Sequence, residues 1–131
     1  KDGLVVKNLD ISLTKETLHL DFSLHNIEGK KTKEGYLWAV VVLKNIKNGK
    51  FEVVGLPDTI SVDTKSLNPL DIETTHRYSI KNFLVNKFSK KLSLEDSLDK
   101  FEVVQLSVFA KNKSSNDSLV YNHSMQDAML Q

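Results

Sequence analysis

The sequence contains no cysteine, and this absence excludes several classes of protein at once. Without a thiol the chain has no disulfide framework, no thiolate zinc site and no cysteine nucleophile. The cellular compartment stays open, because a chain without cysteine tolerates an oxidising space as readily as a reducing one.

Arginine is almost as scarce, since Arg77 is the single example among 18 basic residues. Arginine is the side chain that binds phosphates and guanine edges through two parallel hydrogen bonds. The basic residues are also balanced by 17 acidic ones, so the formal net charge is only +1 and no strong field would attract a polyanion. We therefore expect no nucleic-acid partner.

Long apolar runs are missing as well. The longest, residues 36–43, is far shorter than the roughly 20 residues of a membrane-spanning helix, so no membrane span is expected within the chain. The chain begins at Lys1 rather than at a methionine, and the series of basic, apolar and small residues that marks a signal peptide does not follow. We interpret the chain as an excised or processed fragment, with any anchor outside it.

The main positive signal is an alternation of apolar and polar residues with a period of two, which is typical of strands with one buried face. It is clearest at residues 18–25, where every even position is apolar and His19, Asp21 and His25 share the solvent face. Residues 36–43 are apolar at both odd and even positions, as expected of a central strand covered on both faces. Further strands are expected at residues 4–13, 51–54, 59–62, 77–85, 101–110 and 119–121. In the segment 77–85 we expect Tyr78, Ile80 and Phe83 to point inward, and Phe88 is expected to begin the next loop.

Polar segments and turn residues indicate the connections. Residues 14–17 predict a hairpin turn, and Asn48-Gly49 is the dipeptide favoured in a type I′ hairpin. The irregular stretch 63–75 is predicted to carry the chain from one sheet to the other. Residues 93–98 resemble a helix start but are too few for more than a short connector.

Seven to eight short strands without a long helix predict an all-β fold, a two-sheet antiparallel sandwich of immunoglobulin-like or C2-like type. A closed barrel is the alternative. The 131 residues suit one core, and no repeat or change of composition marks a boundary. We predict a single domain over residues 1–131, with a flexible or weakly helical tail at 124–131.

No residue pattern predicts a catalytic, cofactor or metal site. A nucleophile elbow, a phosphate-binding glycine loop and a zinc-protease motif are all missing, and only five glycines are available to build one. Alternate residues of a strand lie about 7 Å apart, so His19 and His25 cannot bind one ion without a bulge. The loop acids Asp58, Asp63 and Asp71 match no calcium-binding loop. We predict a protein that is not an enzyme and needs no cofactor.

Three segments, residues 35–43, 77–83 and 101–110, together resemble by their pattern a kind of uncharacterised bacterial cell-envelope domain. In such proteins a membrane helix and a coiled coil precede a β-sandwich at the C-terminus. The resemblance implies a periplasmic or extracellular location, with anchoring through a segment outside this chain, and a scaffold or interaction role. It transfers no functional residue.

The leading functional hypothesis is a non-catalytic binding or assembly module of the cell envelope, which contacts a protein partner through a sheet face or an edge strand. The candidate edge consists of Phe51, Val53, Ile60 and Val62. One alternative is a carrier or sensor domain with an apolar cavity between its sheets. A third hypothesis, a hydrolase or metal enzyme, needs at least two of the four histidines close to an acid. The oligomeric state stays open.

Tyr36 and Trp38 have two interpretations. Their strand is apolar at both odd and even positions, which favours a role as core anchors. A platform for stacking against a sugar is the functional alternative.

Overall fold

The computed structural model describes residues 3–14, 16–28, 31–58, 60–92, 101–112 and 119–124. Eight strands and one 3-10 turn, η1 (Ile72–Thr74), form in these ranges. The strands are β1 (Leu4–Thr14), β2 (Thr17–Asn26), β3 (Lys33–Asn45), β4 (Phe51–Leu56), β5 (His76–Ile80), β6 (Phe83–Lys91), β7 (Phe101–Lys111) and β8 (Leu119–Ser124).

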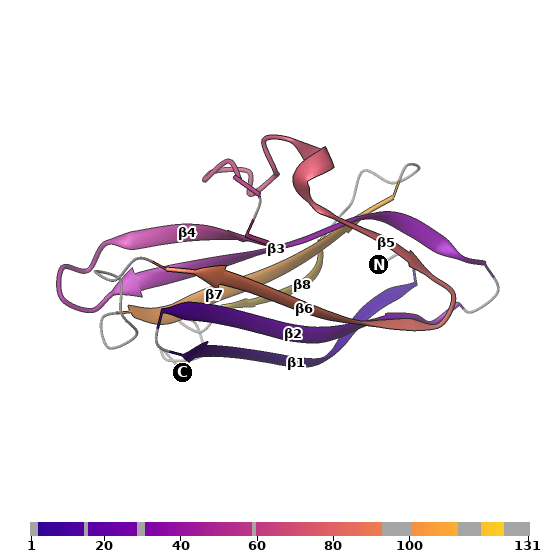
Figure 1. Ribbon diagram of the computed structural model, residues 1–131, viewed down its shortest axis with the longest axis horizontal. Coiled ribbons are helices and arrows are strands. Elements are labelled where there is room, and N and C mark those ends of the chain that lie inside the picture. The colour runs from indigo at the N-terminus through magenta and orange to yellow at the C-terminus, as the bar shows by residue number, and fades with distance from the viewer. Residues whose placement is uncertain are drawn as a thin grey trace.

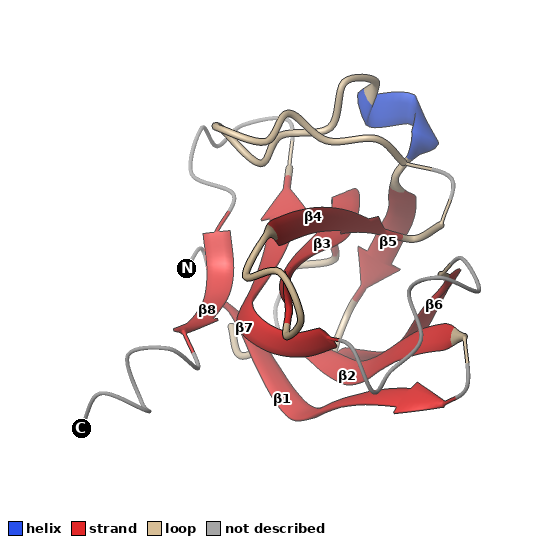
Figure 2. Ribbon diagram, turned by 90° about the vertical axis from the view of Figure 1, so that its left-hand side faces the viewer, coloured by secondary structure: helices blue, strands red, loops and turns tan. Residues whose placement is uncertain are grey.

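The strands form two antiparallel sheets that pack face to face, so the predicted sandwich is confirmed (Figures 1 and 2). One sheet has three strands in the order β1-β2-β6. The other has five strands, in the order β4-β3-β7-β8 with β5 also paired to β3. Strand β3 is therefore central, as its apolar sequence predicts: β7 lies on one side, and β4 and β5 share the other.

The hairpin of β1 and β2 shows how alternation places side chains. The even residues of β2 from Leu18 to Leu24 are buried between the sheets, as predicted. In β1 the register shifts between Lys7 and Asp10, and Asn8 has a φ of 55°. Because of this bulge, the residues of β1 that face the core have even numbers before it and odd numbers after it. The even residues Leu4 and Val6 and the odd residues Leu9, Ile11 and Leu13 consequently pack against the same core.

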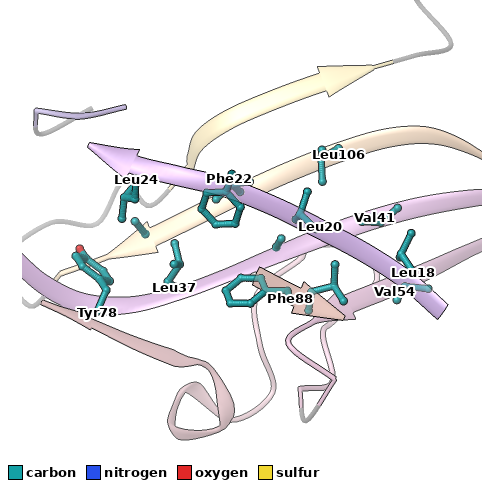
Figure 3. Packing of buried hydrophobic residues seen from close by; sticks show 14 of the residues in the cluster. Leu18, Leu20, Phe22, Leu24, Leu37, Val41, Val54, Tyr78, Phe88 and Leu106 are labelled. Carbon is teal, nitrogen blue, oxygen red and sulfur yellow. The ribbon is translucent and has the colours of Figure 1, made fainter. Parts of the chain in front are cut away.

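The space between the sheets is filled by apolar side chains from both layers (Figure 3). We call this cluster the inner core. The rings of Phe22 and Phe88 meet edge to face, with centroids 5.6 Å apart. Phe88 was expected at the start of a loop, and this prediction is wrong, because Phe88 lies inside β6 with its ring in the inner core.

Residues 77–85 form two strands rather than the single strand predicted. The chain bends at Lys81-Asn82, so β5 pairs with β3 in one sheet and β6 pairs with β2 in the other. Tyr78 and Ile80 point inward as predicted. The inward orientation predicted for Phe83 is wrong, because the even residues face the core in β6 as they do in β5, which leaves Phe83 on the outer face.

The hairpin predicted between β3 and β4 forms, but its turn differs from type I′. A type I′ turn needs positive φ at both central residues, whereas in this loop only Gly49 has one, at 74°. The Asn45 side chain accepts hydrogen bonds from the backbone N–H groups of Lys47 and Asn48, and its carbonyl accepts one from Gly49. The asparagine that precedes the turn therefore organises a longer loop.

The connection after β4 does not cross between the sheets, contrary to the prediction for residues 63–75. It joins β4 to β5, and both strands pair with β3. Residues 60–75 instead fold over the outer face of the five-stranded sheet, away from the other layer (Figures 1 and 2). The strand predicted at 59–62 reduces to one isolated bridge between Val62 and Pro69.

This loop creates a second hydrophobic cluster outside the sandwich, which we call the outer cluster. Its buried members are Trp38, Val40, Ile60 and Phe109. Trp38 is only 1% exposed and stacks on Phe109 with ring centroids 5.1 Å apart. Its indole Nε1 donates a hydrogen bond to the carbonyl of Leu67 at 3.1 Å. Trp38 is thus an anchor, as predicted, but of the outer cluster.

The Asp63 side chain organises the start of this loop. Its carboxylate accepts hydrogen bonds from the backbone N–H and the hydroxyl of Ser66, at 3.0 and 2.8 Å. The bond from the Ser66 hydroxyl is the main reason why the pKa of Asp63 lies below its ordinary value. Asp63 therefore has a structural role in the turn that places Leu67 over Trp38.

The connector predicted at 93–98 lies outside the described residues, and so does the tail predicted at 124–131 except for Ser124, which is the last residue of β8. Within the described ranges, no helix has both the length and the apolar character needed to cross a membrane.

Candidate functional site

The structure brings three of the four residues predicted to form a partner-binding edge, Val53, Ile60 and Val62, together in the outer cluster and leaves Phe51 outside it. Phe51 is exposed at the start of β4, and Val53 is half-buried against the outer cluster. Ile60 and Val62 lie over Gly55 of β4, where a Cβ atom would be 2.8 Å from Ile60 Cγ1. Ile60 is itself buried. The loop therefore covers the outer face of β4 near Gly55, and only the beginning of the predicted edge is accessible.

The outer face of the three-stranded sheet is apolar at one end. Val5, His25 and Phe83 are cross-strand neighbours, and the His25 ring stacks on Phe83 with centroids 5.4 Å apart. Phe83 is 58% exposed, and Val85, two residues further along β6, is 61% exposed. Ile27, just beyond the end of β2, is 65% exposed. We call Ile27, Phe83 and Val85 the apolar patch.

The other end of this face is polar. A hollow of about 380 Å³ is lined by Ser12, Thr14, His19, Asp21, Lys87, Phe88 and Ser89. His19 and Asp21 do share one face with His25, as the alternation predicts, and all three are half-buried. Among the described residues, no three histidine or acidic side chains are grouped closely enough to hold a metal ion.

A third candidate surface surrounds Tyr36, on the outer face of the five-stranded sheet. The Tyr36 hydroxyl donates a hydrogen bond to Glu73 Oε1 at 2.9 Å. Arg77 Nη2 donates to Glu73 Oε2 at 3.0 Å and to the Tyr36 hydroxyl oxygen at 3.3 Å. The Arg77 guanidinium carbon also lies 5.3 Å from the centre of the Tyr36 ring. These three side chains form a closed set of contacts, which we call the tyrosine cluster.

The contacts of the tyrosine cluster shift the pKa values of all three groups. The hydrogen bond to Glu73 is the main reason why the pKa of Tyr36 is raised. The hydrogen bond from Arg77 is the main reason why the pKa of Glu73 is lowered, and the same bond raises the pKa of Arg77. Each shift favours the protonation state that keeps the contacts intact at neutral pH.

Two hollows flank Tyr36. One, of about 270 Å³, is lined by Glu34, Gly35, Tyr36, Arg77, Tyr78 and Ser79. The other, of about 320 Å³, is lined by Tyr36, Trp38, Asn68, Pro69, Ile72, Lys111 and Asn112. Tyr36 contributes to both because its cross-strand neighbours are Arg77 on β5 and Lys111 on β7.

Gly35 allows the strands to approach closely beside Tyr36. A Cβ atom at this position would clash with the backbone carbonyl of Lys111 on the paired strand. A clash with backbone cannot be relieved by a change of rotamer. Gly35 is thus needed for the pairing that places Tyr36 between Arg77 and Lys111.

The sequence indicates only part of the tyrosine cluster. It singles out Tyr36 as a core anchor, but the structure shows Tyr36 half-buried at the margin of the outer cluster. Arg77 stands out only as the lone arginine, and nothing in the sequence distinguishes Glu73 from the other acids. The hydrogen bond between Tyr36 and Glu73 joins residues 37 positions apart. Such a contact depends on how the loop folds back over the sheet.

Comparison with known proteins adds no functional assignment. The chain matches no protein-family model, no curated protein and no solved structure. The geometry described above is therefore the basis for what we propose about function.

Proposed function

We propose that this chain is a non-catalytic module that binds a protein partner through the apolar patch. The observation that carries the proposal is the exposure of three large apolar side chains, Ile27, Phe83 and Val85, at one end of a single sheet. Apolar residues that are exposed together mark interaction surfaces, whereas scattered single ones are common on any protein.

The surroundings of the apolar patch also suit a protein interface. Val85 of the patch pairs across the sheet with Ser23, which pairs in turn with Lys7, and the following row pairs Asp21 with Lys87. An apolar centre with a polar border is the usual anatomy of such an interface. The edge of β4 is a weaker candidate, because residues 60 and 62 of the loop cover part of that strand.

The two alternatives have less support. A carrier or sensor would need an apolar cavity between its sheets, but side chains of the inner core occupy that space, and Trp38 and Phe109 lie in the outer cluster. An enzyme would need histidines close to acids. Two of the four histidines, His25 and His76, make ring contacts with phenylalanines, at 5.4 and 5.7 Å between centroids.

The proposed location of the module is the periplasm or the cell exterior, with attachment through a segment outside this chain. The support is the pattern resemblance of residues 35–43, 77–83 and 101–110 to bacterial cell-envelope domains. In such a setting the apolar patch would recruit or scaffold another envelope protein. Fractionation of cells that express the full-length gene product tests the location, and recovery only in the cytosol would contradict it.

Site-specific photo-crosslinking in the native cell tests the binding surface. A photoreactive amino acid is placed at Val85 in the apolar patch, and separately at Leu70, which is exposed in the loop on the other sheet. We expect a discrete crosslinked product from position 85 that position 70 does not give. If both positions give the same products, or position 85 gives none, the apolar patch is not a protein-binding surface.

A further inference from the structure

The tyrosine cluster lies on the opposite side of the sandwich from the apolar patch, and partner binding at the patch does not involve it. Tyr36 belongs to the outer face of the five-stranded sheet, and Phe83 to the outer face of the three-stranded sheet. We infer that the two hollows beside Tyr36 form a binding site for a neutral oligosaccharide, with the Tyr36 ring stacked against a sugar ring.

The Tyr36 ring is held in place before any ligand arrives. Its hydroxyl donates to Glu73, and the Arg77 guanidinium lies over the ring and bonds to both other members of the cluster. A side chain that is already ordered loses little conformational entropy when it binds. The ring is also only half-buried, so part of its surface remains open to a ligand.

The lining of the larger hollow combines apolar and hydrogen-bonding groups. Pro69 and Ile72 supply apolar surface next to Tyr36. Asn68 supplies an amide and Lys111 an ammonium group, and neither side chain bonds to another residue in the described part of the chain. A sugar ring has the same mixed character, with C–H groups on its faces and hydroxyls around its rim. Amides and ammonium groups are suitable hydrogen-bonding partners for hydroxyls.

The charges around Tyr36 favour a neutral ligand. The two hollows are bordered by Glu34, Arg77 and Lys111, and Glu73 is bound to Arg77. Two negative and two positive side chains leave no net charge at the site. An anionic ligand would therefore gain no attraction from the local field.

The size of the hollows favours a short chain of sugars over a single large ligand. Their volumes of about 270 and 320 Å³ lie near the lower limit for small-molecule sites. Each hollow is open and has room for about one ring. Because Tyr36 borders both, a linear oligosaccharide can place successive rings on its two sides.

A glycan array that carries neutral and acidic oligosaccharides is the first test. We expect the chain to retain at least one neutral oligosaccharide. Retention of none, or of acidic oligosaccharides only, would overturn the inference. A retained oligosaccharide is then titrated into isotopically labelled protein, and the indole N–H signal of Trp38 is followed by NMR. Trp38 is the single tryptophan and borders the larger hollow, so its signal should shift.

Variants then test the residues. Tyr36→Ala should weaken binding about tenfold or more, as expected when a central aromatic contact is removed. Tyr36→Phe keeps the ring and should stay within about threefold of the wild type. Asn68→Ala removes an amide that supports no other described contact, so it should weaken binding even if Tyr36→Ala fails to fold. Wild-type affinity in the Asn68→Ala variant, or in a folded Tyr36→Ala variant, would refute the site.

Phe83→Ala is the matched control, because it removes an exposed aromatic ring from the other sheet. It should leave oligosaccharide binding unchanged while it weakens crosslinking from the apolar patch. Loss of oligosaccharide binding in this variant would place the site elsewhere. The two proposals can therefore fail independently.

Discussion

Single residues decide where the backbone can bend and how closely the strands approach. Asn8 takes a left-handed conformation that asparagine tolerates better than most residues. The resulting bulge keeps the apolar residues on both sides of it directed into the inner core. Gly35 leaves space for the carbonyl of Lys111. Both residues act through backbone geometry rather than through side-chain chemistry.

The Arg77 side chain sets the titration of Glu73. Arg77→Met should bring the pKa of Glu73 back up toward its ordinary value, because the hydrogen bond from Arg77 is the main cause of the lowered pKa. In the wild type, the pair stabilises the fold above the unfolded pKa of Glu73, and this contribution is lost as the pH falls through the folded pKa. Since both side chains are largely exposed, the effect on stability should be small.

NMR titration of the Glu73 carboxyl measures this change directly. Lys90→Met is a suitable control, because Lys90 pairs with Asp58 at 3.1 Å and does not contact Glu73. An unchanged Glu73 titration in Arg77→Met would show that the tyrosine cluster does not persist in solution.

Among the elements, the loop at 60–75 has the largest effect on the surface. Its apolar residues cover Trp38 and Val40, which would otherwise expose apolar surface on the outer face of β3. Covering that surface removes it from water. The same fold brings Asn68 and η1 next to Tyr36 and creates the larger hollow. The loop therefore builds both the outer cluster and the proposed sugar site.

Ile60→Ala should loosen this loop without unfolding the sandwich. Removal of a buried isoleucine side chain costs about 2–5 kcal/mol, and Ile60 packs only in the outer cluster. Amide hydrogen exchange should accelerate at Leu67 and Leu70, whose N–H groups bond to Asp63 and Ser61 within the loop. The amides of β2 should stay protected. Equal acceleration in β2 would mean that the loop and the sandwich open together.

Leu70→Ala is the matched control for this experiment, because Leu70 lies in the same loop with its side chain exposed. An exposed substitution of this kind changes stability by about 0.5 kcal/mol or less. It should leave the exchange of the loop amides close to that of the wild type.

On the scale of the whole molecule, the inner core and the outer cluster lie on opposite faces of the same strand. Leu37, Ala39 and Val41 of β3 point into the inner core, while Trp38 and Val40 point into the outer cluster. If β3 loses its pairing, both clusters lose the side chains that β3 contributes to them. The outer cluster therefore requires a folded sandwich. The stability of the sandwich depends less on the loop at 60–75.

Phe22→Ala should destabilise the whole molecule. Truncation of a buried phenylalanine costs about 3–5 kcal/mol, and Phe22 is fully buried in the inner core. Urea denaturation followed by circular dichroism and by Trp38 fluorescence should give coincident transitions at a lower urea concentration than in the wild type. Two separate transitions, with fluorescence changing last, would contradict the dependence of the outer cluster on the sandwich.

The proposed sites are less visible in the sequence than the fold. Of the predicted edge residues, Ile60 is buried in the outer cluster, because the loop that contains it folds back over the sheet. Phe83 is exposed because the even residues face the inner core in both β5 and β6, so the alternation that places Tyr78 and Ile80 inward places Phe83 outward. The burial of Ile60, by contrast, depends on the path of the loop over the sheet, and this information is not contained in the local pattern of apolar residues.

The sequence by itself determined the all-β class, the positions of most strands, the inward face of β2 and the central place of β3. The first three features follow from period-two alternation, and the central place of β3 follows from its apolar residues at both odd and even positions; both patterns depend only on neighbouring residues. Tertiary structure alone decided the sheet order, the path of the loop and the meeting of Tyr36, Glu73 and Arg77. The physical reason is that the apolar side chains on both faces of β3 must be removed from water. Several apolar segments of the chain could cover the second face, so the local pattern does not select one of them.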